Sequence, residues 1–175
     1  MADLSYVPKT YKKNGGDVLV LADGSALQTE LTSATDATLT LSATAHAGRT
    51  VVLNRAGGIT VTLPAATGTG NRYRLVVGTA LSAASHIIQV ASNTDYLRGV
   101  SLVSADDSSG AVKAWPTANT GTVATESDTV TLDGSTKSGY VGTVVELEDI
   151  ATAIFHVRII GNATGTEATP FSAAV

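Results

Sequence analysis

The strongest structural signal in this chain is Gly58-Ile-Thr-Val-Thr-Leu-Pro64, in which aliphatic residues alternate with threonine. Side chains along a β-strand point to opposite faces in turn, so Ile59, Val61 and Leu63 share one face and the threonines share the other. Threonine and the β-branched aliphatic residues also favour strands over helices. The alternation therefore predicts a half-buried strand that ends at the proline.

The residues on either side of this strand predict its neighbours. Residues 49–54 form a second apolar run, and the glycines of Arg55-Ala-Gly-Gly58 can adopt positive φ at a chain reversal. We therefore expect a β-hairpin made of 49–54 and 58–64. The same alternation predicts further strands at 37–42, 72–77, 86–91, 97–103, 111–115, 128–132, 140–147 and 153–160.

So many short strands, with no helix of ordinary length, predict an all-β fold: a β-sandwich, jelly-roll-like domain with an extended N-terminal arm. A chain of 175 residues is long enough to bury one substantial core. We divide it into an arm at 1–30, the sandwich at 31–162 and a C-terminal tail at 163–175, which has little to order it.

Composition excludes several classes of function. A net charge of −4 with 15% charged residues argues against binding to nucleic acid. The absence of cysteine excludes a disulfide framework, a zinc thiolate site and a thiol nucleophile, and fits a protein matured in a reducing cytoplasm. Residues 75–94 carry no charge, but their Ser, His, Gln and Asn side chains would need partners inside hydrocarbon. No membrane span is expected.

Paired acidic residues at Glu146 and Glu148 offer the arrangement that glycosidases use. Val145 and Leu147 alternate with them, which places both glutamates on the solvated face of a strand. We therefore expect no catalytic residues and no enzymatic activity, and a hydrolase built on this pair is the alternative.

No metal or cofactor site is expected. His46, His86 and His156 are far apart in sequence, and none belongs to a closely spaced ligand pair. The acidic turn at 106–110 lacks the closing glutamate of a calcium loop. Trp115 precedes a proline at a strand end and is expected to anchor a core or an interface, with stacking on a sugar ring as the alternative.

The arm has the composition of a contact segment. Tyrosines supply apolar area with a hydroxyl group, and lysines attract an acidic surface. After a Gly-Gly pair comes a short apolar strand that a small sandwich would not need. A disordered leader is the alternative. The predicted contact residues are Tyr6, Pro8, Lys9, Tyr11, Lys12, Lys13, Val18, Leu19, Val20 and Leu21.

Two segments resemble the bacteriophage head-decoration or head-fibre proteins, small all-β proteins that bind the outside of an assembled capsid. Residues 8–27 contain a basic and aromatic stretch, Gly-Gly-Asp, an apolar run and a Gly-Ser turn. Residues 48–70 contain a strand, a glycine turn, Thr-Leu-Pro-Ala and Gly-x-Gly. Together they cover about a quarter of the chain.

The resemblance implies a homotrimer at threefold or quasi-threefold positions of the phage head, with the leader reaching across neighbouring shell subunits. Its partner would be the major capsid protein, and its location the outer surface of a virion assembled in the host cytoplasm. The alternative is a phage tail or baseplate module that binds carbohydrate through Trp115 and loop aromatics.

Overall fold

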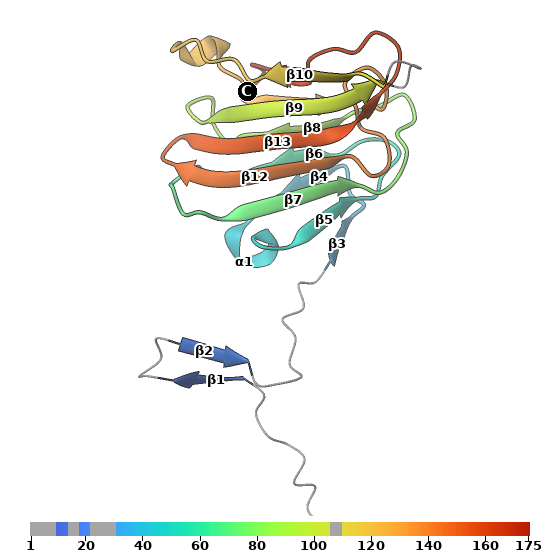
Figure 1. Ribbon diagram of the computed structural model, residues 1–175. Helices are drawn as coiled ribbons and strands as arrows, with labels where there is room; N and C mark the ends of the chain where they lie inside the picture. Colours follow the sequence, from blue (N-terminus) through green and yellow to red (C-terminus); the bar gives the residue numbers. More distant parts are fainter. Residues whose placement is uncertain (1–9, 14–17, 22–30, 106–109) are drawn as a thin grey trace, which may run out of the picture.

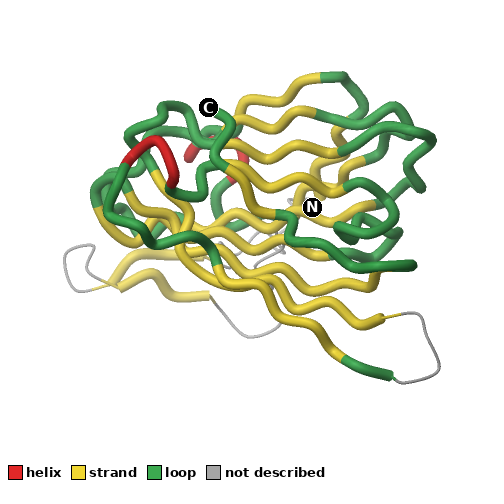
Figure 2. The backbone as a smooth tube through the Cα atoms, turned by 90° about the horizontal axis from the view of Figure 1, so that it is seen from above, coloured by secondary structure: helices red, strands yellow, loops and turns green. Residues whose placement is uncertain are grey.

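The computed structural model describes residues 10–13, 18–21, 31–105 and 110–175. Two β-sheets lie face to face, and Figure 2 shows the two layers of strands stacked. The prediction of an all-β sandwich is confirmed. The larger sheet contains, in spatial order, β10 (Val112–Pro116), β9 (Tyr96–Ala105), β13 (Ile154–Ala163), β12 (Val144–Ala151), β7 (Arg72–Val77), β5 (Thr50–Leu53) and β3 (Leu31–Ala34).

The smaller sheet contains, in spatial order, β14 (Phe171–Ser172), β11 (Thr129–Leu132), β8 (His86–Gln89), β6 (Thr60–Thr62) and β4 (Thr38–Thr40). Helical structure in the described residues is limited to α1 (Ala43–His46) and a 3-10 turn at Val123–Thr125. A separate two-stranded sheet is formed by β1 (Thr10–Lys13) and β2 (Val18–Leu21).

In the first half of the sandwich, from β3 to β8, successive strands alternate between the two sheets. The connections β3 to β4, β5 to β6 and β7 to β8 each cross from the larger sheet to the smaller one (Figure 1). As a result β3, β5 and β7 pair in parallel, and so do β4, β6 and β8. The antiparallel pairing typical of a jelly roll occurs only in the other half, where β12 pairs with β7 and β13.

The predicted hairpin of 49–54 and 58–64 is wrong, because β5 and β6 lie in different sheets. The crossing lets both apolar runs face the same core. It depends on Gly58, which has a φ of +76° and passes so close to the next crossing that a Cβ would lie 2.2 Å from the Ser85 carbonyl oxygen. Gly58, which suggested a hairpin in the sequence, therefore allows the chain to cross from one sheet to the other.

The core fills the space between the sheets. Ile59, Val61 and Leu63 are at most 1% exposed, as their alternation predicts. The rings of Tyr73 and Phe155 meet edge to face with their centroids 6.5 Å apart. Burial of each large aliphatic side chain contributes about 1.5–3 kcal/mol.

The C-terminal segment 163–175 belongs to the sandwich, so the expectation that little orders it is wrong. Strand β14 pairs with β11, and Phe171 is buried in the core. The backbone N–H groups of Ala174 and Val175 donate to the carboxylate of Asp128. Strand pairing, one buried apolar side chain and a buried acceptor together hold a segment that is otherwise rich in Thr, Gly and Ala.

Candidate functional site

The predicted contact residues of the arm are only partly described. Tyr6, Pro8 and Lys9 lie outside the described residues. The others fall in β1 and β2, which pair antiparallel with Tyr11 opposite Val20 and Lys12 opposite Leu19. Neither strand is hydrogen-bonded into the two sheets of the sandwich. The basic and aromatic stretch and the apolar run thus meet as one hairpin within the arm.

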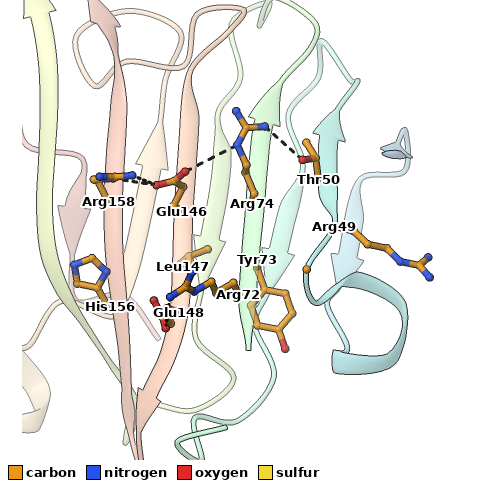
Figure 3. A pocket seen from close by; sticks show the side chains of 11 residues that line it. Arg49, Thr50, Arg72, Tyr73, Arg74, Glu146, Leu147, Glu148, His156 and Arg158 are labelled. Atoms are coloured by element: carbon orange, nitrogen blue, oxygen red, sulfur yellow. Dashed lines mark hydrogen bonds and ion pairs between the residues drawn. The ribbon is translucent and has the colours of Figure 1, made fainter. Parts of the chain in front are cut away.

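A groove of about 520 Å³ lies on the outer face of the larger sheet. Figure 3 shows charged side chains from β7, β12 and β13 that meet in it, with Thr50 of β5 and Arg49 at one end. The strand alternation that buries Tyr73 turns Arg72 and Arg74 outward. In the same way, His156 and Arg158 point away from the core.

The cross-strand register arranges these side chains in two rows. In the first, Glu146 lies between Arg158 and Arg74. The Nε of Arg158 donates to Glu146 at 3.0 Å, and the Nε of Arg74 lies 4.0 Å from the other carboxylate oxygen. In the second, Glu148 lies between His156 and Arg72, whose Nη2 donates to it at 3.1 Å.

The groove concentrates positive charge in an acidic protein. Four arginines and two glutamates line it, an excess of two positive charges in a chain whose net charge is −4. Sequence reasoning placed Glu146 and Glu148 on the solvated face, as found, but missed the arginines. The available signal was the alternation Arg72-Tyr-Arg74, which puts two cations on one face of a strand.

The three histidines remain apart. The part of the chain that the structure describes holds no group of three or more His, Asp or Glu side chains placed to bind a metal. The Nδ1 of His46 accepts from the Ser42 N–H beside α1, and His156 lines the groove. His86 is fully buried, and its Nδ1 accepts from the Ile59 N–H at 3.1 Å. Burial lowers the pKa of His86 to about 4.

Asp149 fixes the loop between β6 and β7. Its buried carboxylate accepts from the N–H groups of Thr67, Gly68 and Thr69 and from the Thr69 hydroxyl. Burial by itself raises the pKa of Asp149, but the hydrogen bonds from Thr69, Gly68 and Thr67 outweigh it and hold that pKa below its ordinary value. The residue is structural, although a row of backbone N–H groups around an anion is also how many binding loops are built.

Asp149→Asn is expected to lower the free energy of unfolding by about 2 kcal/mol, because a neutral amide cannot accept all of these hydrogen bonds. This difference between the two proteins should shrink in acid, because the pKa of Asp149 is lower in the folded protein than in the unfolded chain. The stability that the carboxylate contributes is complete above its ordinary pKa and is lost as the pH falls through the folded-state pKa. Urea denaturation at pH 7 and pH 3 measures both effects. Asp36→Asn, at an exposed carboxylate, is the control; equal losses in the two variants would contradict the assignment.

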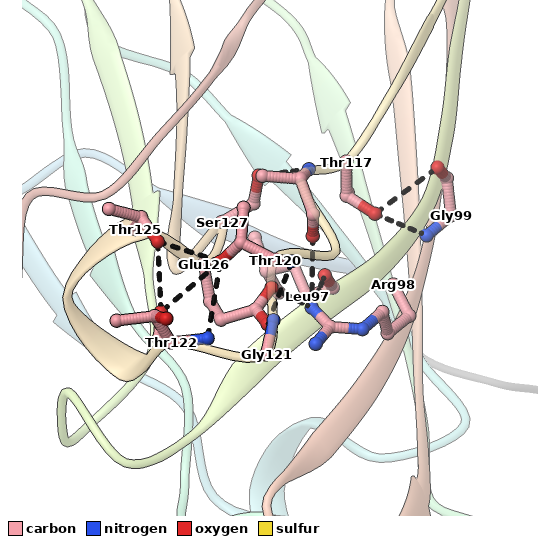
Figure 4. A network of polar contacts seen from close by, with 11 residues as sticks. Leu97, Arg98, Gly99, Thr117, Thr120, Gly121, Thr122, Thr125, Glu126 and Ser127 are labelled. Carbon is pink, nitrogen blue, oxygen red and sulfur yellow. Dashed lines mark hydrogen bonds and ion pairs between the residues drawn. The ribbon is translucent and has the colours of Figure 1, made fainter.

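A second polar network orders the loop between β10 and β11 (Figure 4). The side chain of Glu126 is 3% exposed and forms an ion pair with Arg98 at 2.9 Å. Its other carboxylate oxygen accepts from the N–H groups of Thr120 and Gly121. Removing either charge would leave the other without its partner, so the network is a structural clamp on this loop.

Trp115 lies on β10 and packs, half-buried, against the core. The sequence expectation of an anchoring role agrees with this position. Residues 106–109 of the acidic turn lie outside the described residues.

Comparisons with protein-family models, with curated proteins and with solved structures find no match to this chain. None of the helices in the described residues has the length and apolar character needed to cross a bilayer.

Proposed function

We propose that this protein is a capsid decoration protein of a bacteriophage, which binds the outer surface of the head through its N-terminal arm and stabilises it. The arm carries this proposal. Strands β1 and β2 form a two-stranded sheet of their own. An isolated two-stranded hairpin is marginally stable in water at best, so this one is expected to gain its stability on a partner.

The composition of the hairpin suggests the nature of that partner. Its first strand contains Tyr11, Lys12 and Lys13, and its second consists of Val18–Leu21. Apolar and tyrosine residues supply contact area, and lysines favour an acidic surface. The major capsid protein of a phage head, present in many copies, is the partner proposed. Many modest contacts on one shell add up through multivalency and stabilise its assembled state by mass action.

Deletion of residues 1–21 is expected to abolish co-sedimentation with purified phage heads while leaving the sandwich folded. The core that holds the two sheets together is drawn from residues 34–171, so circular dichroism should still report a cooperative β-protein. Retention of full binding by the shortened protein would overturn the role of the arm.

Charge reversal within the arm tests the same point without deletion. Lys12→Glu with Lys13→Glu should weaken binding to heads by about tenfold or more, because two attractive charges become repulsive. Lys137→Glu in the sandwich is the matched control and should bind as the unaltered protein does.

A light-scattering mass near three times 17.7 kDa would support the proposed homotrimer, and a mass near 17.7 kDa would contradict it.

A further inference from the structure

We propose that the groove on the outer face of the larger sheet binds a polysaccharide whose carboxylates are separated by neutral sugars, of the uronic-acid type. This site is distinct from the arm and does not depend on capsid binding. It would give the protein a second binding surface, which could bind an anionic glycan while the arm binds the phage head.

The first step is charge. Arg49, Arg72, Arg74 and Arg158 line one groove, while the described part of the chain contains only Arg55 and Arg98 besides them. A guanidinium group matches a carboxylate with two parallel N–H donors. Ion pairs with Glu146 and Glu148 occupy some of the five donors on the guanidinium groups of Arg158, Arg74 and Arg72 and orient the rest. The groove therefore holds three arginines that ion pairs orient.

The second step is the backbone. Strands β5, β7, β12 and β13, which form the floor of the groove, each have a neighbour on both sides in the sheet. Their N–H and C=O groups are consumed by the sheet, so no peptide can add to it here as an extra strand. Apart from Gly48, the residues that line the groove offer a ligand their side chains. This favours a ligand that carries its recognition groups on its own rigid rings, as a sugar chain does.

The third step is spacing. Arg158 and Arg74 stand on either side of Glu146, two strand spacings apart, which is about 9.5 Å. A densely charged polymer such as DNA, with one charge per roughly 1.7 Å of axis, would force negative charges against the glutamates. A polymer with a carboxylate on every second sugar can place its charges over arginines and its hydroxyl groups over Glu146 and Glu148. Ionised carboxylates accept hydrogen bonds from such hydroxyls.

The groove is open, so each ion pair with a ligand contributes little and single oligosaccharides should bind weakly and with clear dependence on salt. Several copies held together would bind a long chain much more tightly.

The experiment is a calorimetric titration of the full-length protein with an octasaccharide of alternating glucuronic acid and N-acetylglucosamine. The same octasaccharide with its carboxylates reduced to alcohols, and a heparin octasaccharide, are the comparison ligands. We expect binding of the first that weakens at least about tenfold on carboxylate reduction. Failure of the first to bind at millimolar concentration, or equal binding of the reduced form, would overturn the proposal. So would heparin binding that exceeds it in proportion to the added charge.

The double variant Arg74→Gln with Arg158→Gln should lose at least about tenfold in affinity for the octasaccharide. Both side chains are about half exposed, so the fold should survive, which thermal unfolding checks. Arg55→Gln, an exposed arginine outside the groove, is the matched control and should bind unchanged. Equal affinities of the double variant and the control would place the binding elsewhere and refute the assignment. Since no capsid is present, failure here leaves the proposed function untouched.

Discussion

Gly99→Ala is expected to destroy most of the stability of this protein. Gly99 lies in the middle of β9 with a φ of +155°, opposite Val157 of β13 in the parallel register. A Cβ at this position would lie 1.8 Å from the Val157 carbonyl oxygen and 2.8 Å from its carbon. These are backbone atoms at the centre of the larger sheet, so they cannot rotate away as a side chain would.

The substitution therefore has to push β9 off β13. Both backbone groups of Gly99 are also tied to Thr117, whose N–H donates to the Gly99 carbonyl oxygen at 3.0 Å. We expect a loss of more than about 4 kcal/mol, a large part of the stability of a typical domain. Urea denaturation, or failure to accumulate as soluble protein, is the readout.

Gly142→Ala separates the steric effect from the backbone effect. Gly142 also has a positive φ, +93°, but a Cβ there would meet no atom within 4 Å. Only conformational strain remains, about 1–2 kcal/mol. If Gly99→Ala cost no more than Gly142→Ala, the close approach of β9 to β13 would be wrong.

The strand pattern was predictable from the sequence because burial of alternate residues is a local property. Ile59, Val61 and Leu63 show it directly. Which sheet each strand joins was not predictable from the sequence, because residues 55–58 suit a hairpin and a crossing between sheets equally well. What decides between them is the parallel pairing of β5 with β3 and β7, which involves residues some twenty positions away on either side. Local patterns do not contain that information.

The candidate sites divide in the same way. The solvated glutamates of β12 follow from the alternation in one strand. The groove around them does not follow from one strand, since three of its four arginines come from β7 and β13, which become neighbours of β12 only through the topology. The buried carboxylate of Glu126 has no sequence signal either, because an acidic residue in a polar loop is ordinarily exposed. Asp149 shares the buried face of β12 with Val145 and Leu147, but the loop that it holds lies 80 to 82 positions earlier in the chain.

A fall in pH from 7 to 4 is expected to cost the protein about 3 kcal/mol through His86 alone. The imidazole is fully buried, and no described residue hydrogen-bonds to its Nε2. Its Nδ1 accepts from the Ile59 N–H, so the neutral ring carries its proton on Nε2. Burial without a counter-ion explains why the pKa of this group is lowered from 6.5 to about 4.

The sign follows from proton binding. Between pH 6.5 and pH 4 the unfolded chain protonates its histidine and the folded protein does not, so acid favours unfolding. The contribution of His86 is complete above pH 6.5 and is lost as the pH falls toward 4. A difference of 2.5 pKa units corresponds to roughly 3.4 kcal/mol in full, of which about 3 kcal/mol is lost by pH 4. Asp149, whose pKa is held below its ordinary value of 3.8, loses its contribution only in stronger acid.

His86→Asn isolates this effect, because its amide oxygen can take the place of Nδ1 as acceptor for the Ile59 N–H but does not titrate. The variant should be less stable than the unaltered protein at pH 7, since a smaller side chain leaves a cavity. It should then lose about 3 kcal/mol less between pH 7 and pH 4, measured by urea denaturation at several pH values. If the free energy of unfolding fell equally with pH in the two proteins, His86 would be protonated at pH 4 in the folded state as well as in the unfolded chain. That result would contradict the assignment of His86 as a buried neutral ring.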